Sequence, residues 1–219
     1  GGLVGYNTYG SSIDNTYAIG MVSGWGNVGG LVGFNDGSVS DSFWDVTTSG
    51  TNIGISSYGI FGTSEDVYGL ETPDMMTLTT FTNVGWSIDD AGGTGLTWRI
   101  YDGWSYPLLR DFLTPLNVTA SADGNVSKTY DGNPYYMVNA VYDPADAETS
   151  PNIFCVLTYG AAEGAVNAGT YALTLGGLYS NQVGYDITFG SGELTVNPAV
   201  INLTGTRVYD GTTVFNPTA

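Results

Sequence analysis

The chain has 219 residues, of which 21 are acidic and only four are basic, so its formal net charge is −17. Such an acidic surface repels phosphate backbones, which excludes nucleic acid as a partner. It contains no histidine, so every His-based catalytic triad and His zinc site is excluded, and we expect no enzyme activity.

The residue types predict β structure throughout. The chain holds 33 glycines, 13% of its residues are aromatic and only 11% are charged. Aromatic residues favour strands, and glycines favour the tight turns between them. No stretch approaches the roughly 20 apolar residues of a membrane span, so we expect no membrane insertion.

A repeat opens the chain. Gly-Gly-Leu-Val-Gly-Tyr-Asn at residues 1–7 recurs as Gly-Gly-Leu-Val-Gly-Phe-Asn at residues 29–35, an offset of 28. Further along, Tyr17 matches Phe43 at an offset of 26, which places a two-residue difference in the turn between. Repeats of this length are typical of solenoids.

The repeat predicts a right-handed β-solenoid over residues 1–66, whose coils pair about 4.8 Å apart. We expect Leu3 to stack on Leu31, and Asn7 to stack on Asn35 in a ladder of side-chain amides at a turn. If about four coils fill residues 1–100, the stack is only ~20 Å long, and the last coils are degenerate.

Residues 67–115 are dense in aromatic side chains, and we expect them to cap the end of the solenoid core. Thr72 followed by Pro73 predicts the start of a short helix, with Thr72 as its N-cap. Asp89 and Asp90 are an adjacent carboxylate pair, but neighbours on a strand point to opposite faces, so catalysis there is disfavoured.

A second repeat follows at an offset of 79 residues. Residues 128–132 and 207–211 both end in Tyr-Asp-Gly, with the repeat positions Tyr130, Asp131, Gly132, Tyr209, Asp210 and Gly211. Asp-Gly predicts a turn, and the tyrosine ring is expected to pack at the junction with the preceding module. Period-two alternation in residues 169–175 and 192–196 predicts strands. The unit length predicts an immunoglobulin-like sandwich over residues 116–198 and the truncated start of another over residues 199–219.

Two weaker features lie inside this predicted sandwich. Cys155 is the single cysteine and sits in an apolar run, so we expect it to pack as a small hydrophobic residue. Asp143, Asp146 and Glu148 carry the oxygen ligands that calcium prefers, but they lack the glycine and spacing of an EF-hand. A solvated loop is favoured there, and no other cofactor is expected.

The first repeat resembles the GLUG repeat of bacterial adhesins, and the Tyr-Asp-Gly units resemble the YDG and MBG modules of filamentous-haemagglutinin-like exoproteins. The resemblance implies a protein of the two-partner secretion type, secreted to the bacterial cell surface, in which such modules serve as stalks or spacers. We therefore expect a segment of something longer. GLUG repeats also accompany a zinc peptidase domain, but its His-Glu-x-x-His motif is absent.

Three roles fit this resemblance. The first is a structural and adhesive segment that contacts a host cell, a neighbouring cell or an abiotic surface. The second is a carbohydrate-binding module, in which exposed aromatics such as Trp25 or Trp104 stack on sugar rings. The third is a self-assembling filament subunit, since open sheet edges can pair between chains. The sequence does not identify the ligand.

Overall fold

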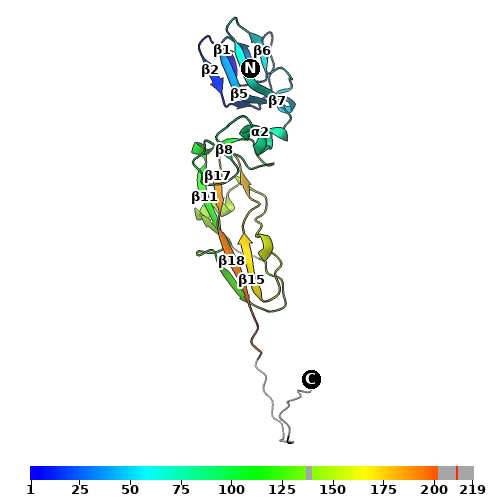
Figure 1. Ribbon diagram of the computed structural model, residues 1–219, viewed down its shortest axis with the longest axis vertical. Helices are drawn as coiled ribbons and strands as arrows, with labels where there is room; N and C mark the ends of the chain where they lie inside the picture. The colour runs from blue at the N-terminus through cyan, green and yellow to red at the C-terminus, as the bar shows by residue number, and fades with distance from the viewer. Residues whose placement is uncertain (137–139, 202–210, 212–219) are drawn as a thin grey trace.

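The computed structural model describes residues 1–136, 140–201 and Gly211. The molecule is elongated, with the N-terminal strands at one end and β15 and β18 at the other (Figure 1). Its elements are mostly strands with a few short helices, which confirms an all-β protein. The strands are β1 (Val4–Asn7), β2 (Ser12–Asp14), β3 (Tyr17–Ala18), β4 (Val32–Asn35), β5 (Ser38–Asp45), β6 (Ile55–Tyr58), β7 (Thr63–Leu70), β8 (Ile88–Asp89), β9 (Trp98–Arg99), β10 (Leu108–Leu109), β11 (Thr114–Thr119), β12 (Val126–Thr129), β13 (Val141–Asp143), β14 (Ile153–Phe154), β15 (Gly169–Thr174), β16 (Tyr179–Ser180), β17 (Tyr185–Phe189) and β18 (Ser191–Asn197). The helices are α1 (Val46–Ser49) and α2 (Leu78–Thr82), with 3-10 helices η1 (Asp74–Met76), η2 (Arg110–Phe112), η3 (Ala145–Thr149) and η4 (Gly160–Ala162).

The first part of the chain passes three times through two parallel ladders. One ladder has the order β1-β4-β6, and in the other β2 and β3 pair with β5, which pairs with β7. The passes cover residues 4–18, 32–45 and 55–70. About four coils over residues 1–100 are therefore not present, because the next strands, β8 to β10, form a separate sheet.

The register of the passes is the one that the sequence predicts. Asn7 pairs with Asn35, and its side-chain amide donates to Asn35 Oδ1 at 2.8 Å. Leu3 donates its backbone N–H to the Leu31 carbonyl, so the two leucines adjoin as expected. Leu31 is fully buried but Leu3 is 45% exposed, since Leu31 lies in the middle pass and Leu3 in an outer one.

Each pass bends at one equivalent residue with a left-handed backbone. Asn15, Asp41 and Asp66 have φ of 49°, 44° and 50°. Glycine tolerates this conformation best, and asparagine and aspartate come next. Beyond the bend, consecutive side chains serve different cores: Phe43 joins the aromatic cluster next to the passes, and Trp44 joins the core inside them.

The aromatic cluster connects the passes to residues 67–115. It contains Phe43, Phe81 and Trp86, and the Trp86 indole N–H donates to the Asp41 carbonyl at 2.7 Å. The helix expected near Thr72 is only the 3-10 turn η1, and the structure assigns Pro73 as its N-cap. The Thr72 hydroxyl is not a cap, because it donates to the buried Asp45 carboxylate instead.

The C-terminal part contains two three-stranded sheets, ordered β13-β11-β17 and β12-β18-β15, and the pair β14-β16. Both alternating segments are strands as predicted, in β15 and β18. Leu116 and Ile187 from one sheet share a core with Leu173 and Leu194 from the other. This core also includes Tyr101, so residues 67–115 contribute to the cores on both sides of them.

Cys155 does not pack as expected. Its side chain is exposed, and its φ of 70° marks a sharp turn directly after β14. The apolar run that contains it is therefore not one continuous buried strand, and this turn places the thiol at the surface.

Candidate functional site

The acidic candidates are not assembled into a metal site. Asp143 ends β13, whereas Asp146 and Glu148 lie on the 3-10 helix η3, and all three side chains are exposed. Across residues 1–136 and 140–201, no group of three acidic or cysteine side chains is arranged to hold a metal ion. The three calcium candidates therefore do not come together into one site.

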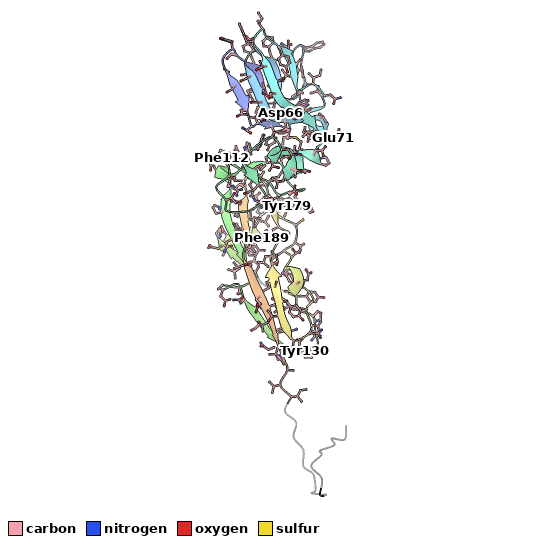
Figure 2. All side chains as sticks on the ribbon, viewed as in Figure 1. Asp66, Glu71, Phe112, Tyr130, Tyr179 and Phe189 are labelled. Atoms are coloured by element: carbon pink, nitrogen blue, oxygen red, sulfur yellow. The ribbon has the colours of Figure 1, made fainter. Side chains whose placement is uncertain are left out.

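The Tyr130-Asp131-Gly132 turn forms as predicted, but the tyrosine is elsewhere than expected. Asp131 Oδ1 accepts from the Asn133 N–H at 3.0 Å, and Gly132 has a φ of 79°. Tyr130 is 42% exposed and lies at the end of the C-terminal part farthest from the passes (Figure 2). Its N–H donates to the Asn197 carbonyl at the end of β18, because β12 and β18 run in parallel. The prediction that the Tyr130 ring packs at the junction with the preceding module is therefore wrong. Tyr209 and Asp210 lie outside the described residues, and Gly211 has a φ of 83°.

The junction between residues 67–115 and the C-terminal part is built around Arg110. Its guanidinium donates to Asp186 Oδ2 at 2.6 Å and to Asp89 Oδ1 at 2.7 Å. The Arg110 side chain is 10% exposed and that of Asp186 is 7% exposed. Asp89 comes from β8, Arg110 opens η2, and Asp186 belongs to β17. We call the residues Asp89, Arg99, Tyr101, Arg110 and Asp186 the joint.

Arg99 and Tyr101 are the two buried members of the joint that lie beside Asp186. Arg99 Nε faces Asp186 Oδ1 at 3.4 Å without hydrogen-bond geometry, so the two interact as charges. The Arg99 guanidinium also lies 4.1 Å from the centroid of the Tyr101 ring. Burial lowers the pKa of Arg99, while Tyr101 and Asp186 beside it act in the opposite direction.

Backbone contacts at the joint fix its geometry. The Tyr101 hydroxyl donates to the Tyr185 carbonyl at 2.6 Å and accepts from the Ile187 N–H at 3.1 Å. Gly92 packs so closely that a Cβ there would lie 2.0 Å from the Ile187 carbonyl oxygen. A side chain at this position would therefore push the two parts of the chain apart.

A second buried polar contact, at Asp45, connects the passes to residues 67–115. Asp45 is fully buried and accepts from the Thr72 hydroxyl, the Tyr106 hydroxyl and the Thr48 N–H. Burial by itself raises the pKa of Asp45, but these donors outweigh it, so the pKa is lowered. The carboxylate thus holds three separate segments together as an anion.

The joint was not predicted from the sequence, although the sequence carries a signal for it. Arg99 and Arg110 are two of only four basic residues in a chain of net charge −17. A cation that is rare in an acidic chain and lies among aromatic residues is a candidate for a buried ion pair. The carboxylate that it pairs with could not be chosen from 21 acidic residues without the tertiary structure.

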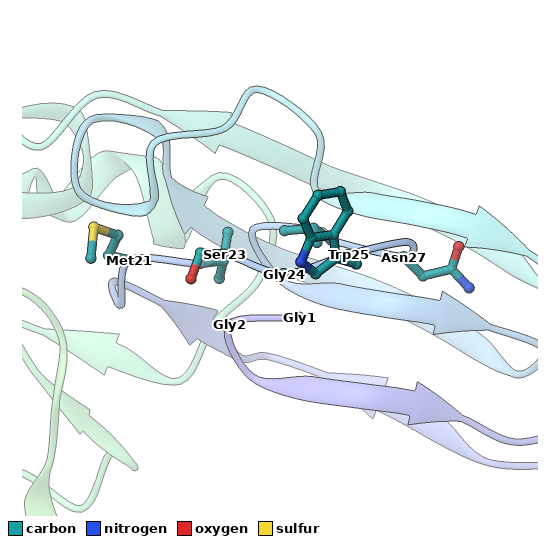
Figure 3. Close-up of a pocket in the computed structure, with 9 residues that line it drawn as sticks. Gly1, Gly2, Met21, Ser23, Gly24, Trp25 and Asn27 are labelled. Carbon is teal, nitrogen blue, oxygen red and sulfur yellow. The ribbon is translucent and has the colours of Figure 1, made fainter.

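The exposed tryptophans named from the sequence lie in different surroundings. Trp25 is fully exposed beside a shallow hollow of about 420 Å³, which Gly1, Gly2 and Met21 also line (Figure 3). Trp104 is 58% exposed and stacks on Tyr179, with ring centroids 5.2 Å apart. The two tryptophans therefore do not form one platform for a ligand.

Comparison with known proteins gives one partial likeness. Over 96 residues, 41% of the chain, it is 38% identical to a protein of Evansella cellulosilytica described as "Putative Gly-rich membrane protein". The chain spans about a tenth of that protein's length. In the part of the chain that the structure describes, no helix has the length and apolar character to cross a membrane. No family model matches the chain. No solved structure matches it either.

Proposed function

We propose that this chain is a structural and adhesive spacer of a large secreted bacterial surface protein, and that it is not an enzyme. The observation that carries the proposal is the joint. There, buried ion pairs connect residues 67–115 to the C-terminal part in place of a flexible linker. A spacer has to hold successive modules at a fixed angle. Buried charges of this kind are costly to separate, because each would be left without its partner.

The proposal assigns a module to each part of the chain. Residues 1–66 form a right-handed β-solenoid, residues 67–115 cap it, and residues 116–198 form an immunoglobulin-like sandwich. The start of a second sandwich, predicted over residues 199–219, lies outside the described residues except for residues 199–201 and Gly211. In-register parallel passes support the solenoid, and two sheets around one core support the sandwich. The order of the GLUG-like and Tyr-Asp-Gly motifs supports an exoprotein of the adhesin type.

The carboxylates near the joint support a structural role over catalysis. Asp89, the first member of the adjacent pair, accepts from Arg110, and Asp186 accepts from both Arg110 and the Gly93 N–H. A general acid or base has to exchange protons with a substrate. Both carboxylates are instead bound to Arg110, and that of Asp186 is buried as well.

Small-angle scattering tests the rigid connection. We expect residues 1–219 to scatter as one extended particle, and Asp186→Asn to broaden the distribution of interatomic distances because the joint opens. Asp131→Asn, which removes the surface ion pair with Lys128, should scatter like the wild type. A wild-type profile of two freely hinged bodies would contradict the proposal.

Surface labelling tests the location. An antibody raised against residues 1–219 should bind intact cells that produce the full-length protein, and external protease should remove the signal. Signal confined to lysed cells would contradict secretion. Sedimentation velocity separates the spacer from a filament subunit, because a subunit would gain mass as its concentration rises.

A further inference from the structure

A notch lies between the first and third passes because their turns differ in length. Residues 8–11 connect β1 to β2 and residues 59–62 connect β6 to β7, whereas Asp36 and Gly37 alone connect β4 to β5. The strands on both sides of these turns stay in register. The two outer turns are therefore longer by two residues and extend beyond the middle one.

Two aromatic rings bridge this notch. Tyr9 from the first turn and Phe61 from the third have ring centroids 4.6 Å apart and planes tilted by 52°. Tyr9 is 69% exposed and Phe61 is 58% exposed, so each ring keeps a large free surface. The Phe61 N–H donates to Asp36 Oδ1 at 3.1 Å, which fixes the third turn against the middle one.

Three hydroxyl-bearing residues in a row also line the notch. Ser12, Ser38 and Thr63 are register neighbours on β2, β5 and β7, and all three are exposed. Neighbouring strands place such side chains about 4.8 Å apart. Together with Tyr9, Phe61 and the residues of the turns, they line a hollow of about 250 Å³.

We propose that this hollow binds an uncharged glycan. One sugar ring lays its C–H face on Tyr9 and Phe61, and its hydroxyls exchange hydrogen bonds with the row Ser12, Ser38 and Thr63. Aromatic rings beside a few convergent polar groups are the features of a site for a ligand that is apolar on one face and polar on its edges. Asp36 also lines the hollow and adds a carboxylate acceptor.

Charge selects the class of glycan. The chain carries a net charge of −17, and Asp36 is the charged residue among those that line the hollow. Uronic and sialic acids would be repelled by this field, whereas neutral hexoses would not. This inference is independent of the spacer role, since a glycan could bind whether or not the joint is rigid.

The test titrates residues 1–219 with cellohexaose, mannohexaose and chitohexaose in a calorimeter. We expect at least one of them to bind, with an affinity that changes less than about twofold between about 50 and 500 mM salt. Tyr9→Ala and Phe61→Ala should each weaken binding by about tenfold or more. Tyr9→Phe should keep most of the affinity, while Tyr9→Leu should lose it, because the leucine is apolar but has no ring face.

Trp25→Ala is the matched control, since Trp25 is an exposed aromatic outside the hollow. It should leave glycan affinity unchanged, and all variants should keep the wild-type melting temperature. Absence of binding to all three hexasaccharides overturns the proposal. Equal loss in Trp25→Ala, or stronger binding of polygalacturonate than of the neutral sugars, also overturns it. A lower melting temperature in Tyr9→Ala with unchanged affinity would assign the ring to the fold alone.

Discussion

Arg110 and Asp186 are 76 residues apart in the chain, yet their side chains meet at 2.6 Å between the two halves of the molecule. Arg110 lies on one side of the contact in η2 and Asp186 on the other in β17. Both side chains are at most 10% exposed, so solvent screens their attraction little. The pair therefore helps to fix the relative position of residues 67–115 and the C-terminal part.

Asp186→Asn should destabilise the chain by about 3–5 kcal/mol, because it leaves Arg99 buried without a carboxylate and Arg110 with Asp89 alone. Urea unfolding measures this loss. Asp131→Asn, at an exposed ion pair, should leave the unfolding midpoint almost unchanged. Equal effects of the two substitutions would show that the joint contributes no more than the surface pair.

Asp45→Asn should remove a pH dependence of stability. The folded-state pKa of Asp45 lies below its ordinary value of 3.8, so its stabilisation is present above that pH and is lost as the pH falls through the folded-state pKa. Urea midpoints from about pH 2 to pH 7 should therefore fall less steeply at acid pH for Asp45→Asn than for the wild type. Asp111→Asn, at an exposed position of η2, is the control, and a profile identical to that of Asp45→Asn would contradict the assignment.

Asn35→Ala should cost about 1–3 kcal/mol, because it strands buried polar groups. The Asn35 amide donates to the Thr63 carbonyl, and its oxygen accepts from the Asn7 amide and the Gly37 N–H. Thermal unfolding followed by circular dichroism measures the effect. The exposed Asn27→Ala should be close to neutral, and a similar drop there would argue against the amide ladder.

Tyr130→Ala should cost only about 1 kcal/mol, well below the ~3–5 kcal/mol of a fully buried aromatic. The reason is that Tyr130 is 42% exposed at the end of β12. Tyr159, which is 8% exposed in the core of the C-terminal part, provides the comparison. Chemical denaturation should rank Tyr159→Ala as much more harmful, and the reverse order would mean that Tyr130 packs more tightly than its exposure indicates.

The sequence by itself determined the features that repeat over short distances. The offsets of 28 and 26 residues predicted the pairing of Asn7 with Asn35 and of Tyr17 with Phe43, and both pairs are present. The difference between the offsets also predicted the shorter middle turn. Stacked repeats place equivalent residues side by side, so a position in the sequence translates directly into a position in the ladder. The turn at Asp131 and Gly132 was predicted from the sequence as well, because a turn is decided by its own residues.

Only the tertiary structure decided the contacts between parts that do not repeat. The left-handed bend at Asp41 sent Phe43 to one core and Trp44 to another, and the turn at Cys155 placed that thiol at the surface in the middle of an apolar run. The pairing of Arg110 with Asp186 depends on which strand lies beside β11, the strand that follows Arg110 in the chain. Any of 21 acidic residues could satisfy an arginine by charge, and only the parallel pairing of β17 with β11 selects Asp186.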